Sequence, residues 1–254
     1  MILAILQARY SSTRLPGKVL RTILGKPMLL HQIERIKNSK RIDRLVVATS
    51  TDESDDDIEK MCLDSNIEVY RGNLDNVLDR FYQCANEYDP EHVVRLTGDC
   101  PLTDSQVIDQ VIDKHIISKS SYTSNAIPPT YPDGLDVEIF KLSTLKEAWN
   151  FAKLPSELEH VSPYIRKYLD SNQMHNLECE IDLSAHRWTV DDPEDFRFVK
   201  KVYLELYPMN HKFNTRDILD LLDRKPHLKK INYHIMRNEG LLKTYKKDNE
   251  FLKK

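Results

Sequence analysis

The 254-residue chain lacks the features that mark membrane proteins and nucleic-acid-binding proteins. No run of about 18 apolar residues occurs, so the sequence predicts no transmembrane helix. The apolar N-terminal stretch is short and has no basic leader, which is typical of a buried strand and not of a signal peptide. The formal net charge is −3, so electrostatics do not favour nucleic acid as the main partner. We therefore expect neither membrane insertion nor a nucleic-acid partner.

Cysteine and glycine are both scarce. The four cysteines are scattered and form no C-x-x-C pair; together with the missing signal peptide, this predicts free thiols in a reducing cytoplasm. Glycine occurs only six times in 254 residues, roughly a third of its ~7% average share. A chain with so few glycines is expected to keep them where the backbone requires them. Five lie beside predicted strands or turns that we expect to line one cleft: Gly17, Gly25, Gly72, Gly98 and Gly134.

Several well-known catalytic signatures are also absent. The sequence has no G-x-x-x-x-G-K-[ST] phosphate loop, no G-x-G-x-x-G dinucleotide fingerprint and no G-x-S-x-G nucleophile turn. The histidines show no metal-ligand spacing, and we expect His160 to lie on the surface of a helix. Any catalytic or ligand-binding residues of this chain must therefore belong to other motifs.

The first half of the chain alternates short apolar runs with helical patterns. Strands are predicted at 2–6, 45–49, 67–70 and 93–96. Capping residues followed by apolar residues at helical spacing predict helices after Ser54, Asn73 and Thr103. Strands that are hydrophobic on both faces and separated by helices require a parallel sheet covered on both sides. We therefore predict an α/β fold with a doubly wound, mostly parallel sheet.

The second half has a different pattern. Residues 135–140 alternate between apolar and polar side chains, as a half-exposed strand does. Asp192 and Pro193, with acidic residues after them, predict the start of a helix. Further helices are predicted at 142–152 and 157–169, and further strands at 177–183 and 187–190. No linker separates two domains, so we predict one domain over residues 1–231 and a basic, loosely held tail over 232–254.

The loop after the first predicted strand carries three basic residues, Arg9, Arg14 and Lys18. In open α/β sheets, ligands bind at the carboxyl ends of the strands. Residues 11–13 (Ser-Ser-Thr) leave backbone N–H groups accessible, and Pro16-Gly17 makes a turn. Basic side chains and exposed amides together form a site for a polyphosphate. The alternative interpretation is a solvated basic loop.

Two acidic segments follow predicted strands later in the chain. Asp99 lies beside Gly98 directly after the fourth strand, where a carboxylate can hold a hard cation. Asp191 and Asp192 precede a helix that needs only one of them as its cap. Two carboxylates from distant parts of the chain, converging on a nucleotide-bound Mg²⁺, suit phosphoryl or nucleotidyl transfer. The alternative for each aspartate is a turn or a helix cap.

Other charged residues point to the same cleft. Arg71 follows the third strand, so it lies at the same edge of the sheet. Arg80 lies on the next helix, and its alternative role is a surface charge pair. Asp136 and Glu138 share one face of a strand with period two, and Asp133 precedes them. Such an acidic stripe can bind sugar hydroxyls or a cation; the alternative is the solvent-exposed face of a sheet.

Together these motifs resemble a known family. Residues 8–18 (ARYSSTRLPGK), followed by 25–28 (GKPM), resemble the N-terminal signature of the CMP-Kdo synthetase group of cytidylyltransferases. From about residue 1 to 231 the chain is more similar to the SpsF-type spore-coat polysaccharide biosynthesis proteins. The further segments that carry this similarity are 70–72 (YRG), 77–80 (VLDR), 97–102 (TGDCPL), 132–138 (PDGLDVE) and 188–191 (WTVD).

The resemblance implies a three-layer α/β/α fold of the nucleotide-diphospho-sugar transferase (glycosyltransferase-A-like) type, a CTP-dependent reaction and a homodimer. It implies that Arg14, Lys18 and Asp99 are catalytic, and that Asp99 and Asp191 hold Mg²⁺. The residues expected to bind the nucleotide are Gln7, Ala8, Arg9, Ser12, Thr13, Arg14, Lys18, Arg71, Arg80 and Gly98. The residues expected to bind the sugar are Asp133, Asp136 and Glu138.

The chain departs from the CMP-Kdo synthetase pattern in two places. Those enzymes carry Gln before the Gly-Asp pair and Glu after it, where this chain has Thr97 and Cys100. Their signature begins Ile-Pro-Ala-Arg, where this chain has Leu6-Gln7-Ala8-Arg9. These differences affect the selection of the base and of the acidic sugar, and they leave the metal and phosphate positions unchanged.

The implied reaction is attack of a sugar hydroxyl, expected to belong to an acidic keto-sugar, on the α-phosphorus of CTP with release of pyrophosphate, for cell-surface polysaccharide or glycan biosynthesis. One alternative is a sugar-1-phosphate nucleotidyltransferase, which would want more basic residues in the acceptor half than this acidic stretch offers. Another is a glycosyltransferase, whose Asp-x-Asp motif has its nearest match at 55–57, an acidic first helical turn. A third is a nucleotide-sensing protein without activity, against which the complete set of phosphate and metal residues argues.

Overall fold

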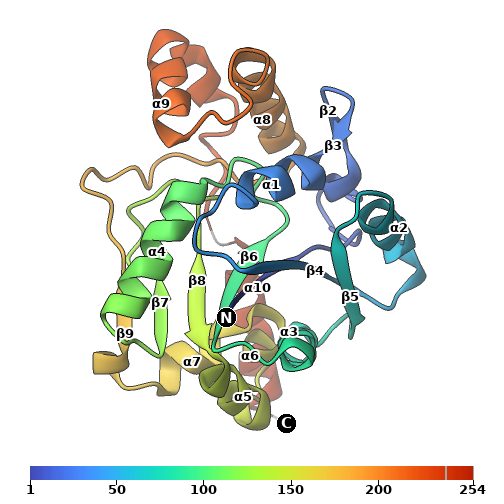
Figure 1. The fold of residues 1–254 in the computed structure, drawn as a ribbon, viewed down its shortest axis with the longest axis vertical. Helices are drawn as coiled ribbons and strands as arrows, with labels where there is room; N and C mark the ends of the chain where they lie inside the picture. Colours follow the sequence, from blue (N-terminus) through green and yellow to red (C-terminus); the bar gives the residue numbers. More distant parts are fainter. Residues whose placement is uncertain (238, 254) are drawn as a thin grey trace.

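The structure is a computed structural model that describes residues 1–237 and 239–253. Its centre is a seven-stranded sheet in the order β5-β4-β1-β6-β8-β7-β9 (Figure 1). The strands are β1 Ile2–Gln7, β4 Arg44–Ser50, β5 Glu68–Gly72, β6 His92–Thr97, β7 Tyr122–Ser124, β8 Glu138–Lys141 and β9 Met174–Asn176. Only β8 runs antiparallel to its neighbours in this sheet. The predicted α/β fold with a mostly parallel sheet is therefore confirmed.

The order of the strands determines where a ligand can bind. From β1 the chain moves outward through β4 to β5 and then returns to β6, on the other side of β1. The carboxyl ends of β1 and β6 therefore lie side by side, with Gln7 paired to Thr97. Connections leave these two ends in opposite directions, which opens a crevice between them.

Helices cover both faces of the sheet (Figure 1). One face packs against α1 Met28–Ile36, α2 Asp56–Asp64 and α4 Ser105–Ile117, and the other against α3 Val77–Tyr88, α5 Leu142–Phe151 and α7 Ser162–Tyr168. Successive residues of β1 enter opposite cores, because side chains of a strand alternate between its faces: Ala4 and Leu6 face the first set of helices, and Leu3 and Ile5 the second. The predicted three layers are confirmed.

A third core lies beyond the carboxyl edge of the sheet. It contains α8 Pro193–Leu206 and α9 Thr215–Arg224, which lie at the top in Figure 1. The β2–β3 hairpin (Thr22–Ile23 and Lys26–Pro27) adds Ile23, and Trp188 is buried in the centre. Because Leu15 and Leu135 pack into the same core, it holds three loops of the cleft together. Short 3-10 helices are present at Lys18–Leu20, Glu53–Asp55, Ser171–Gln173 and Pro226–Lys230.

Three predicted elements differ from the structure. The helix expected at 157–169 is two helices, α6 Pro155–His160 and α7, because Val161 has a positive φ of 68° that interrupts the helix. Residues 177–183 are not a strand, and the strand β9 precedes them. Residues 187–190 make one isolated bridge, between Arg187 and Asp133. Apolar periodicity cannot create a strand where no neighbouring strand offers a hydrogen-bonding ladder.

The C-terminal segment is more ordered than the loosely held tail that we predict. Residues Glu239–Phe251 form helix α10, which packs against α6. Asp248 accepts a hydrogen bond from the Ser156 backbone N–H at 2.9 Å, and His160 hydrogen-bonds with the Thr244 hydroxyl at 3.0 Å. In residues 1–237 and 239–253, no helix combines the length and apolarity that crossing a membrane requires.

Candidate active site

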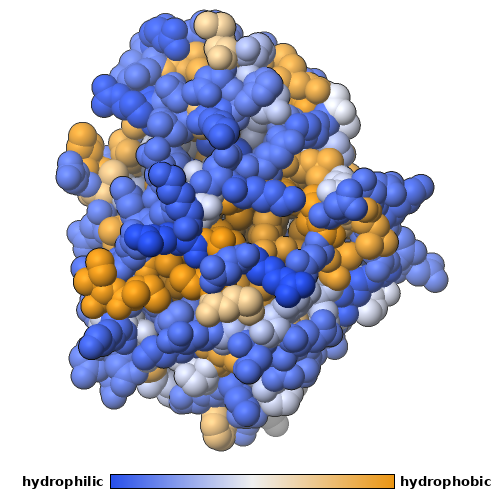
Figure 2. All heavy atoms as spheres, viewed as in Figure 1, coloured by the Kyte–Doolittle hydropathy of each residue, from blue (hydrophilic) through white to orange (hydrophobic). Residues whose placement is uncertain are grey.

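A cleft of about 570 Å³ lies at the carboxyl ends of β1 and β6. Its walls come from the loop after β1, the turn after β6, the segments before β8 and α8, and helix α10. The face in Figure 2 is mostly hydrophilic, and its apolar residues form patches across the middle of the view, from the side where α4 ends to the opposite side. The cleft is the place that the strand order singles out for a ligand.

The loop after β1 is fixed by backbone contacts. The Tyr10 N–H donates to Asp55 Oδ1 at 2.6 Å, and the Gly17 N–H donates to the Tyr10 carbonyl at 2.9 Å. Gly17 has a φ of 65°, a conformation that glycine adopts without strain. Asp55 is fully buried and also accepts the Ser50 N–H at 3.0 Å. The sequence suggested only an acidic first turn for Asp55, whereas the structure shows that it anchors the phosphate-loop candidate.

Lys18, Asp99 and Asp191 meet in the floor of the cleft. The Lys18 ammonium lies 3.1 Å from Asp99 Oδ2 and 2.9 Å from Asp191 Oδ1, and it donates to the Val190 carbonyl at 2.7 Å. Burial alone would lower the pKa of Lys18, but the two carboxylates outweigh it and raise the pKa above its ordinary value. Burial would raise the pKa of Asp99, but Lys18 and a hydrogen bond with Thr97 lower it to about 2. Lys18 and Asp99 are therefore both charged at neutral pH.

Arg14 reaches the same site from the side of the loop. Its guanidinium lies 3.0 Å from Asp191 Oδ2, 2.9 Å from Asp192 Oδ2 and 3.3 Å from Glu239 Oε2. Asp192 is the N-cap residue of α8, but its side chain makes no capping hydrogen bond. Instead the Asp195 carboxylate accepts the backbone N–H groups of both Asp191 and Asp192 at 3.0 Å. Both aspartates are thereby free to face Arg14.

The other predicted nucleotide residues divide into two groups. Residues that line the cleft are Gln7, Ala8, Arg9, Ser12, Thr13, Arg80 and Gly98. A Cβ on Gly98 would lie 3.0 Å from the Gln7 carbonyl and 3.1 Å from Ala8 Cβ, so the absence of a side chain lets the end of β6 pack tightly against this loop. Arg71 is not among the lining residues. Its guanidinium is paired with Asp56 and Glu59 at 2.7 Å each, at the start of α2.

Arg80 is buried on helix α3, so it does not form the surface charge pair that the sequence offered as its alternative role. It donates to the Asn73 carbonyl at 2.7 Å, and its Nε has no partner among the described residues. Burial, with the nearby charge of Arg9, lowers the pKa of Arg80 to about 10. A buried cation with an unused donor beside the cleft is suited to an anionic or polar ligand.

The three predicted sugar-binding carboxylates all line the cleft, and each has an arginine partner. Asp133 pairs with Arg187 at 2.9 Å and Asp136 with Arg237 at 2.5 Å, and Glu138 pairs with Arg95. Burial and the charge of Asp136 raise the pKa of Asp133 to about 7, although Arg237 and Arg187 oppose the shift. Burial also raises the pKa of Asp136, whereas Arg95 outweighs burial and lowers the pKa of Glu138.

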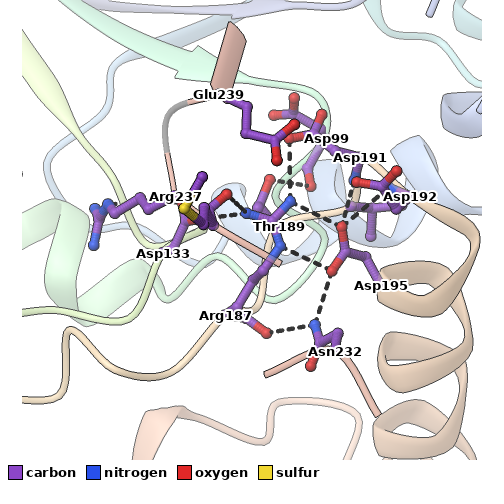
Figure 3. Close-up of polar contacts among 12 residues, drawn as sticks. Asp99, Asp133, Arg187, Thr189, Asp191, Asp192, Asp195, Asn232, Arg237 and Glu239 are labelled. Atoms are coloured by element: carbon purple, nitrogen blue, oxygen red, sulfur yellow. Dashed lines mark hydrogen bonds and ion pairs between the residues drawn. The ribbon is translucent and has the colours of Figure 1, made fainter. Parts of the chain in front are cut away.

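A charged network that sequence reasoning missed supports these residues (Figure 3). Arg187 binds Asp195 through two nitrogen atoms, each at 2.9 Å, and Asn232 donates to Asp195 at 2.8 Å. Arg187 stands directly before the 188–191 motif, and Asp195 lies in the first turn of α8. In the sequence, the position of Arg187 beside this motif was the one sign that it could belong to the site. Burial opposes the charge of Arg187, but Asp195 raises its pKa further.

His160 lies in the cleft and not only on the surface of a helix. It lines the wall beside Glu159 and Thr244. Burial and the charge of Arg95 lower the pKa of His160 to about 4, so the ring is neutral at pH 7. A neutral imidazole there can accept or donate a hydrogen bond to a ligand.

Known proteins resemble the chain over most of its length. The model of a family described as cytidylyltransferase matches residues 3–212. The spore coat polysaccharide biosynthesis protein SpsF of Bacillus subtilis is 34% identical over 232 residues, which cover 89% of this chain and 95% of that protein. The 3-deoxy-manno-octulosonate cytidylyltransferase of Marinobacter nauticus is 42% identical over 114 residues, 43% of this chain and 42% of that protein. A solved structure of a cytidylyltransferase from Leptospira borgpetersenii has a TM-score of 0.86 at 31% identity, over 93% of this chain and 99% of that chain.

Proposed function

The chain belongs to the cytidylyltransferase family, and we propose that it transfers CMP from CTP to a hydroxyl group of an acidic keto-sugar, with release of pyrophosphate. Membership confirms the resemblance predicted from the motifs and the predicted fold type. The observation that carries the proposal is the convergence of Lys18, Asp99 and Asp191 at the switch point of the sheet. With Arg14 beside them, they offer positive charge for phosphates and carboxylate oxygens for a cation.

We further propose that Asp99 and Asp191 hold Mg²⁺. Their carboxylates fit a cation, because one oxygen of each lies close to the same ammonium group, that of Lys18, at 3.1 and 2.9 Å. Mg²⁺ is commonly bound by one or two carboxylates together with substrate phosphates and water. Across residues 1–237 and 239–253, His, Cys, Asp and Glu side chains form no metal-binding group of three or more, in keeping with a metal that arrives with the nucleotide. When bound, Mg²⁺ would neutralise charge on the α-phosphate.

The cations of the loop after β1 provide the phosphate side of the site. Lys18 is kept charged by its two carboxylate partners, so it can stabilise negative charge that develops on the departing pyrophosphate. Arg14 exchanges carboxylate oxygens for phosphate oxygens when the nucleotide binds, since its planar fork suits both. The chain needs no nucleophile of its own, because the acceptor hydroxyl attacks and the residues position it and neutralise charge.

The acceptor side of the cleft carries paired charges. Because Asp133, Asp136 and Glu138 each have an arginine partner, they repel an anionic acceptor less than unpaired carboxylates would. Arg166 lines the same side, and within the described part of the chain its side chain makes no hydrogen bond or ion pair. In the sequence, the acidic residues of this stretch counted against a sugar 1-phosphate as acceptor. Because arginines neutralise these carboxylates, the stretch no longer disfavours such an acceptor. An acidic keto-sugar suits these charges, and a sugar 1-phosphate is the second candidate.

The proposed setting follows from the relatives. The name of the Bacillus relative refers to the biosynthesis of a spore coat polysaccharide. We propose that this chain acts in the cytoplasm as a homodimer that activates a sugar for a cell-surface polysaccharide or glycan. Light scattering on the purified protein tests the assembly: a mass of about 60 kDa, twice the 29.8 kDa of the chain, supports the dimer, and a mass near 30 kDa contradicts it.

Pyrophosphate release with each of the four nucleoside triphosphates, across a panel of acidic keto-sugars and sugar 1-phosphates, tests the activity. We expect release with CTP and Mg²⁺ that depends on an acidic keto-sugar. Release with UTP and a sugar 1-phosphate would contradict the proposed class of substrate. Omission of the metal is the control for the proposed cation site.

Replacement of Asp99 tests the residue assignment. The change Asp99→Asn removes one carboxylate from the floor of the cleft, so we expect kcat to fall at least about 100-fold, as for the loss of one preorganised electrostatic partner. The matched control is Asp57→Asn, because Asp57 is exposed at the start of α2 and away from the cleft. Turnover of Asp99→Asn near that of the wild type, at saturating Mg²⁺, would contradict the assignment.

A further inference from the structure

Arg187 is a buried cation at the centre of the charged network in Figure 3. Its side chain is 6% exposed. Two of its nitrogen atoms bind Asp195 at 2.9 Å each, a third contact reaches Asp133 at 2.9 Å, and a fourth reaches Asp191 at 3.3 Å. A charged side chain is buried at a high cost in free energy unless it is paired. Loss of any of these partners would therefore leave part of the guanidinium buried without a compensating contact.

The partners of Arg187 come from the two sides of the cleft. Asp191 belongs to the proposed cation site, and Asp133 belongs to the acceptor side. Asp195 is fully buried in the first turn of α8 and supplies the fixed end of the network. An arginine is needed for these contacts, because its planar fork addresses three carboxylates at once, which a lysine ammonium on a flexible stem does not.

The contacts of Asp191 show what this network controls. Its Oδ2 atom faces Arg187 at 3.3 Å and Arg14 at 3.0 Å, while its Oδ1 atom faces the Lys18 ammonium at 2.9 Å. Its backbone N–H donates to Asp195 at 3.0 Å. The main chain and one carboxylate oxygen are therefore both held, and the other oxygen is directed to the position shared with Asp99.

We propose that Arg187 is a positioning residue that orients Asp191 for the divalent cation and, through Asp133, links that carboxylate to residues 132–137 before β8 (the acceptor loop). This inference rests on the proposed function, because it requires a cation between Asp99 and Asp191. Groups that hold metal ligands in place commonly change metal affinity 10- to 100-fold when they are replaced. A residue that served stability alone would lower the free energy of unfolding without altering cation affinity in the folded protein.

Binding of Mn²⁺ to the full-length protein in the presence of CTP and without acceptor, followed by electron paramagnetic resonance against a blank of CTP alone, tests the proposal. For Arg187→Lys we expect the Mn²⁺ dissociation constant to rise about 10-fold or more. We also expect a lower kcat at moderate Mg²⁺ that excess Mg²⁺ restores in large part. The matched control is Arg216→Lys, since Arg216 is exposed on α9 and pairs with Asp220 on the surface.

The outcomes separate the inference from the proposed function. If the wild-type protein with CTP binds no more Mn²⁺ than CTP alone, both the cation site and its positioning residue are wrong. If the wild type binds Mn²⁺ and folded Arg187→Lys binds it within about twofold, the positioning role alone is wrong. If Arg187→Lys does not fold, Asp133→Asn replaces it, because it removes a carboxylate that pairs with the guanidinium at 2.9 Å and, among the described residues, makes no hydrogen bond with Asp191. The same loss of Mn²⁺ affinity is then expected, and unchanged affinity overturns the proposal.

Discussion

At the scale of single residues, the cleft shows how paired charges can be kept ready for a charged ligand. Lys18 has carboxylates on two sides, and their attraction outweighs the cost of burying its ammonium group. Asp99 is held ionised by the same contact. A nucleotide that brings its own phosphates and cation can therefore exchange with groups that are already charged and positioned, which reduces the reorganisation needed at the moment of reaction.

Asp133 predicts a pH dependence of stability. Burial and Asp136 raise its pKa from 3.8 to about 7, so the folded state favours the neutral carboxyl. A raised pKa contributes stability that is complete below about pH 4 and is lost as the pH rises through about 7. Relative to Asp133→Asn, the wild type should lose on the order of 1 kcal/mol per pH unit between pH 5 and 7, and little more above pH 7.

Urea unfolding of the two proteins at pH 5, 6, 7 and 8 measures this difference. Groups that do not interact with Asp133 titrate alike in both proteins, so the difference in the free energy of unfolding reports Asp133 together with its neighbour Asp136. The exposed control Asp57→Asn should show no such slope. A difference that stays constant from pH 5 to pH 8 would show that Asp133 is ionised throughout.

At the scale of elements, the acceptor loop is fixed to the segment before α8 by close backbone contact. The N–H groups of Trp188 and Thr189 both donate to the Asp133 carbonyl, at 2.6 and 2.9 Å. Gly134 follows with a φ of 108°, and a Cβ there would lie 2.5 Å from the Thr189 nitrogen. The absence of a side chain at Gly134 therefore lets the two cleft segments meet.

We expect Gly134→Ala to lower the free energy of unfolding by at least about 2 kcal/mol and to weaken the contact of the acceptor loop with the segment before α8. Gly25→Ala is the matched control, because Gly25 also has a positive φ, of 79°, but nothing within 4 Å of the added Cβ. That change should cost about 1 kcal/mol. Denaturant unfolding compares the two variants, and equal losses would show that backbone conformation matters and the contact with Thr189 does not.

Helix α10 contributes a competing anion to the cleft. Glu239 at its start lies 3.3 Å from Arg14, the residue proposed to hold phosphate. For Glu239→Gln we expect the KM for CTP to fall by up to about fivefold, since partly exposed ion pairs contribute about 0.2–1 kcal/mol. Steady-state kinetics at fixed Mg²⁺ measure it, with Glu250→Gln on the exposed side of α10 as control. A higher KM would mean that Glu239 helps to bind the nucleotide.

At the scale of the whole molecule, the site exists only when distant segments are folded together. Lys18 follows β1, Asp99 follows β6 and Asp191 precedes α8, and the third core holds the loop after β1 against the segment before α8. The cleft is thus a property of the complete domain. Ligands that bind this folded arrangement, and not the unfolded chain, must stabilise the whole domain.

CTP with Mg²⁺ should accordingly raise the melting temperature. At a ligand concentration of about 100 times Kd the gain is about 2.7 kcal/mol, or roughly 5–10 °C for a chain of this size. Differential scanning fluorimetry with CTP, UTP, ATP and GTP, each with and without Mg²⁺, measures it. We expect the largest shift with CTP and Mg²⁺. Equal shifts with all four nucleotides would indicate a site that reads phosphates without selecting the base.

The sequence by itself determined the α/β class, the position of the phosphate-loop candidate and that of Asp99, whereas it left Asp191 and Asp192 as alternatives between which the family resemblance chose Asp191. These depend on local patterns: apolar strands, helix caps, and polar residues at the ends of strands, where the topology of a parallel sheet must bring them together. It also predicted strands at 177–183 and 187–190 that did not form, because a strand depends on partners elsewhere in the chain.

Only the tertiary structure decided which charges are paired. Arg187 meets Asp133 from 54 residues away, and Glu239 meets Arg14 from 225 residues away. Local patterns carry no record of such contacts, since they depend on side-chain direction and on burial in the folded chain. The acidic stretch at 133–138 therefore had no visible partners in the sequence, whereas folding supplies each of its carboxylates with an arginine.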